Sequence, residues 1–161
     1  MKNLILVRHG KSSWDYNVDD KDRPLKERGI DDAHLVASKF KSQNIKIDAV
    51  FSSQAIRALH TCAIFLRELN VPFSKLQINN DLYDFSGESV FQFVEGLPKN
   101  IDTALIFGHN NAFTNVVNTL GNKYIENVVT SGLVHISFNV DAWKDVSKGV
   151  TEQILFPKQI Q

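Results

Sequence analysis

Three short segments combine cationic or imidazole side chains with small residues, each directly after an apolar stretch. They are Arg8-His9-Gly10-Lys11, Ser52-Ser53-Gln54-Ala55-Ile56-Arg57 and Gly108-His109-Asn110-Asn111. Arginine side chains can hold phosphate oxygens in pairs, and the free N–H groups at a helix N-terminus attract anions. A neutral imidazole has a lone pair that can attack phosphorus. The segments together predict a phosphate-sized anion site with an imidazole inside it.

Each segment alone is a weak signal. An Arg-His pair after a strand is usually a polar turn, Arg57 alone would usually be a surface charge, and His109 alone could cap a helix. Cationic and imidazole side chains at the ends of three strands together favour one shared site. Gly10-Lys11-Ser12 looks like the end of a P-loop, but that loop requires a glycine where this chain has Ile5, so nucleotide binding of that kind is not expected.

Hydrophobic patterning predicts the elements that position these segments. Short apolar runs predict strands at 4–7, 47–51, 76–78, 103–107, 134–138 and 151–156, and helical spacing predicts helices at 30–40, 56–70, 90–97 and 110–120. This alternation indicates one α/β domain over residues 1–161, a three-layer α/β/α sandwich with a mostly parallel central sheet. In such sheets the reactive residues lie beyond the carboxyl ends of the strands, so the three segments can converge.

Local signals add expectations about where elements begin and end. Pro24 can start the first helix after a long polar loop over residues 11–24. The pair Ser52-Ser53 offers an N-cap to the second helix, and Gly121 a C-terminal cap to the last long one. Strand 134–138 alternates apolar and polar residues and is expected to be half exposed, with His135 facing away from its apolar neighbours.

Composition excludes several classes of protein. Among 161 residues, 18 Lys and Arg balance 18 Asp and Glu, which excludes a globally basic nucleic-acid binder but allows a local cationic pocket. The single cysteine, Cys62, permits no intrachain disulfide or cysteine-rich zinc site and is expected to be a small buried residue. The apolar run Leu4–Val7 is too short for a signal peptide or a membrane span, so we expect a cytoplasmic protein without a membrane partner.

The three motifs resemble the histidine phosphatase superfamily, which has the phosphoglycerate mutase-like fold. Those motifs are Arg8-His9-Gly10, Ser-Ser-x-x-x-Arg-Ala-x-x-Thr around Arg57, and Gly108-His109-Asn110. The segment Asp22–Gly29 and the short chain resemble more narrowly the SixA-type phosphohistidine phosphatases. The resemblance implies that His9 is the nucleophile that becomes phosphorylated, that Arg8 and Arg57 hold the phosphoryl oxygens, and that His109 is the second histidine of the site.

This resemblance leads to a mechanism that needs no metal and no other cofactor. His9 must be neutral to attack, and its ordinary pKa of about 6.5 leaves a neutral fraction at pH 7. A backbone carbonyl bound to one ring nitrogen would fix the tautomer and direct the other nitrogen at phosphorus. His109 is expected to be a cation beside the phosphate, which would raise its pKa. The arginines and His109 then supply the positive charge.

The general acid for the leaving group is left open by the sequence. An alcohol leaving group needs a positioned acid, for which Asp84 is the first candidate and Glu88 the second. A phosphohistidine substrate needs the acid less, because its imidazole can already carry a proton. Asp15 falls where some relatives place an asparagine beside the pocket. Trp14 can either wall the pocket or anchor its loop.

The leading interpretation is a phosphatase that removes the phosphoryl group from phosphohistidine on a phosphotransfer protein. A small-molecule phosphomonoesterase of the same superfamily is the main alternative. A phosphoglycerate mutase is less expected, because the segments around His109 are too short to cover a mutase site. A non-catalytic phosphate-binding module is the alternative from another class. No nucleic-acid partner is expected.

Overall fold

A single six-stranded sheet forms the centre of the computed structural model, which describes residues 1–160. The strand order is β3-β2-β4-β1-β5-β6. The strands are β1 (Lys2–Arg8), β2 (Ala49–Ser52), β3 (Leu76–Ile78), β4 (Thr103–Gly108), β5 (Leu133–Phe138) and β6 (Val150–Leu155). The first four strands pair in parallel, whereas β5 runs antiparallel to both β1 and β6. The expected mostly parallel sheet is confirmed.

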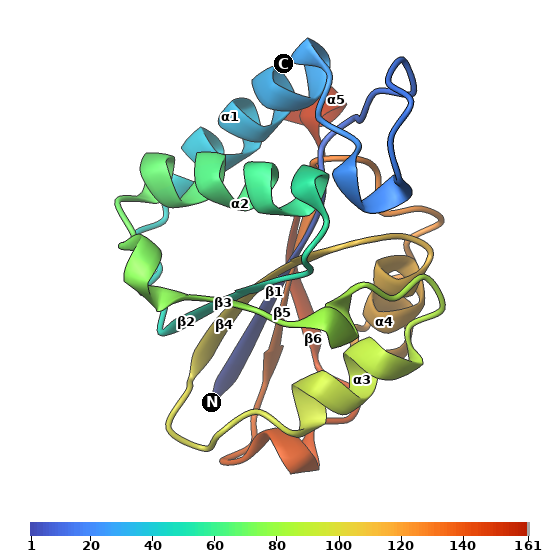
Figure 1. The fold of residues 1–161 in the computed structure, drawn as a ribbon. Coiled ribbons are helices and arrows are strands. Elements are labelled where there is room, and N and C mark those ends of the chain that lie inside the picture. Colours follow the sequence, from blue (N-terminus) through green and yellow to red (C-terminus); the bar gives the residue numbers. More distant parts are fainter. Residues whose placement is uncertain (161) are drawn as a thin grey trace.

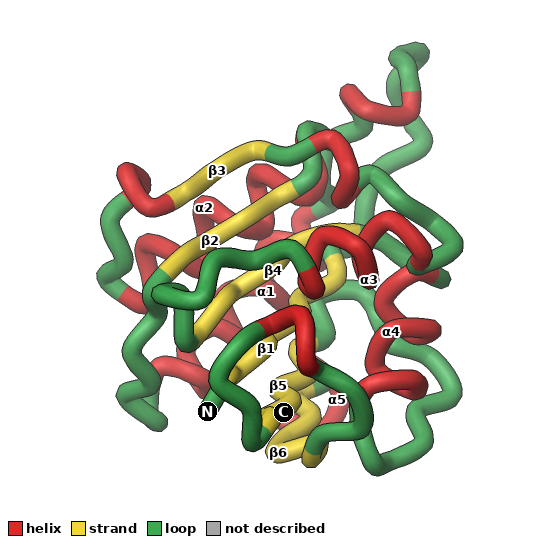
Figure 2. The backbone as a smooth tube through the Cα atoms, turned by 90° about the horizontal axis from the view of Figure 1, so that it is seen from below, coloured by secondary structure: helices red, strands yellow, loops and turns green. Residues whose placement is uncertain are grey.

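Helices cover both faces of this sheet (Figure 1, Figure 2). On one face lie α1 and α2, which pack against each other, and on the other lie α3 and α4. The helices are α1 (Glu27–Lys41), α2 (Ile56–Leu69), α3 (Glu88–Glu95), α4 (Ala112–Leu120) and the short α5 (Pro157–Ile160), which packs beside α1. The three-layer α/β/α sandwich is therefore confirmed.

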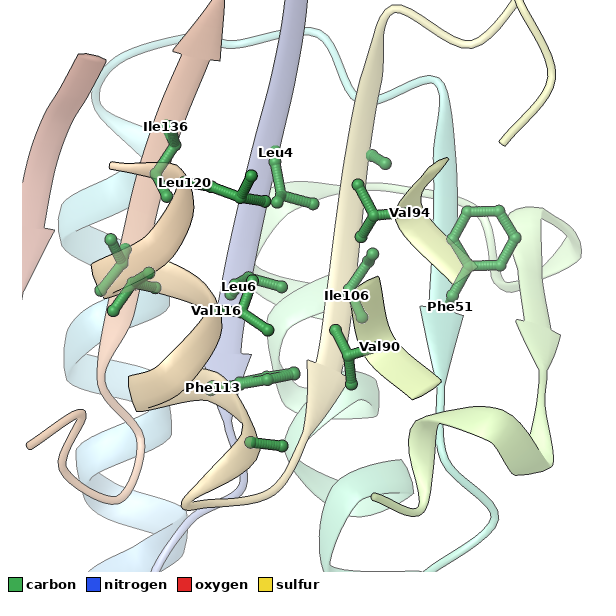
Figure 3. Packing of buried hydrophobic residues seen from close by; sticks show 14 of the residues in the cluster. Leu4, Leu6, Phe51, Val90, Val94, Ile106, Phe113, Val116, Leu120 and Ile136 are labelled. Carbon is green, nitrogen blue, oxygen red and sulfur yellow. The ribbon is translucent and has the colours of Figure 1, made fainter. Parts of the chain in front are cut away.

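The central strands are buried on both sides because their successive side chains face opposite helical layers. In β1, Leu4 and Leu6 belong to the core under α3 and α4, which Figure 3 shows from close by. Ile5 and Val7 belong to the second core, under α1 and α2. Cys62 is fully buried in that second core, as expected of a small apolar side chain.

The first long helix begins at Glu27 and not at Pro24. The residues just before it pair instead with the loop that follows β1. The Ser13 N–H donates to the carbonyl of Pro24, and the Lys26 N–H donates to the carbonyl of Lys11. These bonds keep the chain extended through residues 24–26 and dock the start of α1 beside the end of β1.

Strand β5 is buried along its whole length, so the expectation of a half-exposed strand is wrong. It lies between β1 and β6 with helices on both faces. His135 does face away from its apolar neighbours, but it is only 7% exposed and its Nε2 lies 2.8 Å from Asn3 Oδ1. The Gly121 cap is confirmed, since its N–H donates to the carbonyl of Val117 at the end of α4.

Every helix within residues 1–160 is too short or too polar to span a bilayer.

Candidate active site

The three predicted segments meet because their strands are neighbours at the middle of the sheet. Strand β4 lies between β2 and β1, and all three run in the same direction. The His9 N–H donates to the carbonyl of Gly108 at 3.0 Å, and the Ser53 N–H donates to the carbonyl of Phe107 at 3.2 Å. Backbone pairing thus continues one residue past each strand and places His9, Ser53 and His109 side by side.

His9 is held in the orientation that a nucleophile needs. Its Nδ1 lies 2.7 Å from the carbonyl oxygen of Gly10, which can only accept, so Nδ1 carries the proton. Nε2 keeps its lone pair and accepts a long bond of 3.4 Å from Arg57 Nε. Burial, together with the positive charges of Arg57 and Arg8, lowers the pKa of His9 to about 3. The imidazole is therefore neutral at pH 7, as attack on phosphorus requires.

Gly10 fits closely between the strand and the start of α1. A Cβ atom at this position would lie 2.8 Å from the carbonyl oxygen of Gly29 and 3.1 Å from Ser131 Oγ. The Gly10 N–H donates to the hydroxyl of Thr61 at 2.9 Å, in α2. The absence of a side chain lets the backbone that orients His9 lie directly against both helices.

The two predicted arginines approach the site from different elements. Arg57, in the first turn of α2, is 2% exposed, and its Nε faces His9. Its other two nitrogens donate to Asp20, one to the backbone carbonyl and one to the carboxylate at 2.8 Å. Arg8, at the end of β1, donates through Nη1 to the carbonyl of Val128 at 2.9 Å. Among the described residues, its buried Nε has no hydrogen-bond partner.

His109 is fully buried beside His9, with 5.2 Å between the ring centroids. Its other neighbours include the rings of Tyr83 and Phe85, at 5.2 and 5.0 Å. Burial, and then the neighbouring His9 and Arg57, lower the pKa of His109 to about 3. The protein's own groups therefore favour a neutral His109, and the expected cationic His109 stays a prediction for the site with a phosphate bound. A bound phosphoryl dianion would act in the opposite direction.

The two serines at the end of β2, Ser52 and Ser53, do not cap α2 as expected. The cap position is Ala55, which makes no side-chain cap bond. Ser53 Oγ instead lies 2.7 Å from His109 Nε2 and accepts a bond of 3.3 Å from the Ala55 N–H. Ser52 Oγ donates to the backbone carbonyl of Ser53. Ser53 is fully buried, and its hydroxyl is therefore a hydrogen-bond partner of His109 and not a cap of α2.

Two residues that the sequence analysis did not select, Asp20 and Arg23, complete the site. The Asp20 carboxylate accepts bonds from Arg57, from Arg23 Nη1 at 3.1 Å and from the Tyr83 hydroxyl. Although partial desolvation opposes it, these bonds hold the pKa of Asp20 well below its usual range. Arg23 is 7% exposed and lies over the ring of Trp14. Their signals in the sequence are faint, since Arg23 belongs to the SixA-like segment and Asp20 to a loop without pattern.

The site opens into a cavity of about 320 Å³. Its lining includes four cations and, among the described residues, one carboxylate, that of Asp20. The cations are Arg8, Lys11, Arg23 and Arg57. His9 lines the cavity directly, whereas His109 contacts it through the rings of His9 and Phe85. Such an excess of fixed positive charge is suited to a phosphoryl dianion.

Neither candidate for the general acid lies at this cavity. The Asp84 carboxylate accepts bonds from the backbone N–H groups of Ser86, Gly87 and Val90 and thereby caps α3. Although desolvation opposes it, these bonds lower the pKa of Asp84, which makes it a poor proton donor. Glu88 is an exposed residue in the first turn of α3. The structure brings neither carboxylate to His9.

The two residues of undecided role in the first loop differ in position. Asp15 is exposed and does not line the cavity, and its N–H donates to Ser13 Oγ. Trp14 does line the cavity, although it is 75% exposed. Within residues 1–160, no group of three or more His, Cys, Asp or Glu side chains is arranged to hold a metal ion.

Comparisons with known sequences agree with these motifs. The sequence profile of the histidine phosphatase superfamily (branch 1) matches residues 4–99, which is more than half of the chain. A 2,3-bisphosphoglycerate-dependent phosphoglycerate mutase of Gloeothece citriformis (strain PCC 7424) is 44% identical over 73 residues, covering 42% of this chain and 30% of that protein. The phosphoglycerate mutase of Schizosaccharomyces pombe (strain 972 / ATCC 24843) is 42% identical over 72 residues, covering 43% and 34%. The matches span about a third of the length of these relatives.

Solved structures match the fold over nearly the whole chain. The protein histidine phosphatase SixA complexed with tungstate has a TM-score of 0.84 at 22% identity, covering 99% of both chains. A phosphoserine phosphatase from Entamoeba histolytica, in complex with 3-phosphoglyceric acid, has a TM-score of 0.64 at 16% identity, covering 96% of both chains. The fold is thus shared with a protein histidine phosphatase and with a phosphoserine phosphatase. With its motifs, its sheet and the profile match in agreement, the chain belongs to the histidine phosphatase superfamily (branch 1).

Proposed function

We propose that the protein is a phosphatase that forms a phosphohistidine intermediate on His9 and acts on phosphohistidine carried by a phosphotransfer protein. The observation that supports it most is the state of His9, which is buried and neutral. The Gly10 carbonyl fixes its tautomer, and its unprotonated Nε2 accepts a long bond from Arg57 in a cation-rich cavity. This arrangement suits an activated nucleophile next to a cation-rich site for a phosphoryl group.

The reaction proceeds in two transfers of the phosphoryl group. In the first, a bond forms between His9 Nε2 and phosphorus while the bond to the substrate nitrogen breaks, and the substrate imidazole, already protonated at its other nitrogen, leaves as a neutral ring with the electron pair of the broken bond. In the second, water attacks phosphorus, the bond to His9 breaks, and inorganic phosphate is released with His9 neutral again. Arg8 and Arg57 stabilise the charge on the equatorial oxygens in both steps. Arg23 adds a third guanidinium to the same cavity.

The choice of phosphohistidine depends on the leaving group. An alkoxide needs a proton from a positioned acid, but the one carboxylate among the described cavity residues, Asp20, is held ionised by its hydrogen bonds. An imidazole that is already protonated leaves without such an acid. The likeness in fold to the protein histidine phosphatase SixA supports the same substrate class. The sequence likeness to phosphoglycerate mutases supports the alternative, hydrolysis of a small phosphomonoester.

The test compares the wild type with His9→Ala, with His34→Ala as the control. His34 is an exposed histidine that contacts Glu68 on the surface of the helical layer. Each protein is assayed on a phosphohistidine-carrying protein and on a panel of sugar and nucleotide phosphates, with acid-labile phosphoenzyme trapped in parallel. We expect turnover of phosphohistidine and trapping in the wild type and the control, and neither in His9→Ala. Trapping of phosphoenzyme in His9→Ala contradicts the mechanism, and turnover of only the phosphomonoesters contradicts the substrate class.

A further inference from the structure

Two aromatic side chains line the active-site cavity without a role in the steps above. Trp14 comes from the loop after β1 and is 75% exposed. Phe85 comes from the loop between β3 and α3 and is 45% exposed. His9, which lines the same cavity, is only 8% exposed. The nucleophile therefore lies at the inner end of the cavity and the two aromatic rings lie at its opening.

Arg23 covers one face of the Trp14 ring. The guanidinium carbon of Arg23 lies 3.3 Å from the centroid of the indole ring. Arg23 is itself fixed by three bonds, to the carbonyl of Ser13 at 3.1 Å, to the hydroxyl of Ser12 at 2.6 Å and to the carboxylate of Asp20 at 3.1 Å. Because one face of the indole is covered and the side chain is still 75% exposed, the other face is open. It is a flat, apolar surface beside the cavity.

The leaving group must lie on this side of the site. In phosphoryl transfer the attacking atom and the leaving atom lie on opposite sides of phosphorus. With His9 Nε2 at the inner end, the leaving group extends toward the opening and its aromatic rings. The cavity also favours leaving groups that depart without a carboxylic acid, because Asp20 already binds Arg57, Arg23 and the Tyr83 hydroxyl. Imidazoles and phenols are both leaving groups of this kind, and both are planar rings.

We propose that Trp14 and Phe85 form a subsite for a planar aromatic leaving group, which stacks on the open face of the Trp14 indole. The inference rests on the proposed function, since it places the leaving group relative to His9. The subsite binds the ring itself, whether that ring belongs to a phosphohistidine or to an aryl phosphate. Because Phe85 also packs against the rings of Tyr83 and His109, Trp14 is the residue that tests the subsite without disturbing the histidine.

The test compares Trp14→Ala and Trp14→Phe with a matched control, Tyr16→Ala. Tyr16 is on the same loop and is 62% exposed, but it does not line the cavity. The inhibitors are phenylphosphonate, methylphosphonate and inorganic phosphate, and the substrates are phenyl phosphate and a phosphohistidine peptide. We expect Trp14→Ala to weaken phenylphosphonate and to lower kcat/KM for both substrates about tenfold, with methylphosphonate and phosphate unchanged. Trp14→Phe should restore most of the loss, and Tyr16→Ala should show none.

Three results would overturn the subsite, and a fourth would contradict its use by phosphohistidine. An equal loss for methylphosphonate and phenylphosphonate in Trp14→Ala would mean that Trp14 only supports Arg23. An unchanged phenylphosphonate affinity would mean that the ring is not contacted. An equal loss in Tyr16→Ala would assign the effect to the loop as a whole. A loss for phenyl phosphate but not for the phosphohistidine peptide would restrict the subsite to aryl phosphates and contradict its use by phosphohistidine.

Fluorescence separates this inference from the proposed function. The chain has two tryptophans, and the other, Trp143, is fully buried and donates to the carbonyl of Ile101. Phenylphosphonate should therefore shift the emission of the wild type but not that of Trp14→Phe. This binding measurement needs no turnover. A protein that shows the shift but never hydrolyses phosphohistidine contradicts the proposed function alone, whereas one that hydrolyses it through His9 without the shift contradicts the subsite alone.

Discussion

His109 makes the stability of the protein sensitive to acid, and its replacement by glutamine tests the size of that effect. Burial, then His9 and Arg57, lower the pKa of this imidazole from 6.5 to about 3, so the folded protein keeps it neutral. The unfolded chain binds a proton at the same residue below pH 6.5. Stability therefore falls as the pH drops through 6.5 and continues to fall until about pH 3, where the folded protein is protonated as well.

The loss between pH 8 and pH 5 follows from these two pKa values. At pH 8 neither state is protonated, and at pH 5 only the unfolded state is. The ratio of protonated to neutral imidazole in the unfolded chain at pH 5 corresponds to about 2 kcal/mol. His109→Gln removes this titration while keeping a polar group near Ser53. The decrease in the free energy of unfolding between the two pH values should thus be smaller by about 2 kcal/mol in the variant.

Urea unfolding at pH 5 and pH 8 in phosphate-free buffer measures this difference. All other titrating groups are common to both proteins, and any constant loss from the altered packing cancels in the comparison. His34→Gln, which changes an exposed histidine, serves as the control. If the wild type and His109→Gln lose the same free energy between pH 8 and pH 5, then His109 is not held neutral by its surroundings and the electrostatic account of the site is wrong.

Three further substitutions test how the site is held together. Arg57→Lys keeps the charge but loses the guanidinium donors to Asp20 and His9, and turnover should fall about 100-fold with little change in the melting temperature. Asp20→Asn should weaken vanadate binding about tenfold, because Arg57 and Arg23 lose the anion that they share. The control Asp22→Asn should leave vanadate binding unchanged. Tighter vanadate binding by Asp20→Asn would instead show that Asp20 competes with vanadate for the two arginines. Gly10→Ala should lower the free energy of unfolding by about 1–3 kcal/mol, measured in urea, because its Cβ would meet the Gly29 carbonyl.

The strand ends could be predicted from the sequence because they depend on local patterns. An apolar run such as Leu4–Val7 identifies a strand buried on both faces, and helices between the strands imply parallel pairing. Parallel pairing then brings His9, Arg57 and His109 to one edge, whatever the details of the loops. The same reasoning fails for β5, because its alternating pattern does not reveal that a sixth strand and two helical layers bury its polar residues too.

The remaining site residues depend on contacts between distant parts of the chain. Asp20 reaches Arg57 only because the loop after β1 pairs with the start of α1, and no periodicity in residues 11–24 encodes that pairing. Ser53 has the local signature of a helix cap, yet the structure uses its hydroxyl for His109, 56 residues away. A residue that can make either a local or a distant bond is assigned by sequence reasoning to the local one.

The charge balance of the chain has a specific consequence at this cavity. Equal numbers of acidic and basic residues leave the protein neutral, yet four cations and one carboxylate are among the described residues that line the site. A cationic histidine at this position would repel those arginines and could not attack phosphorus. Burial is the main cause of the lowered pKa of His9, and the charges of Arg57, Arg8 and Arg23 lower it further, so the field that suits a phosphoryl dianion also helps to keep the proposed nucleophile unprotonated. The same arginines therefore favour both a bound phosphoryl group and a neutral His9, whereas burial is the larger cause of the lowered pKa.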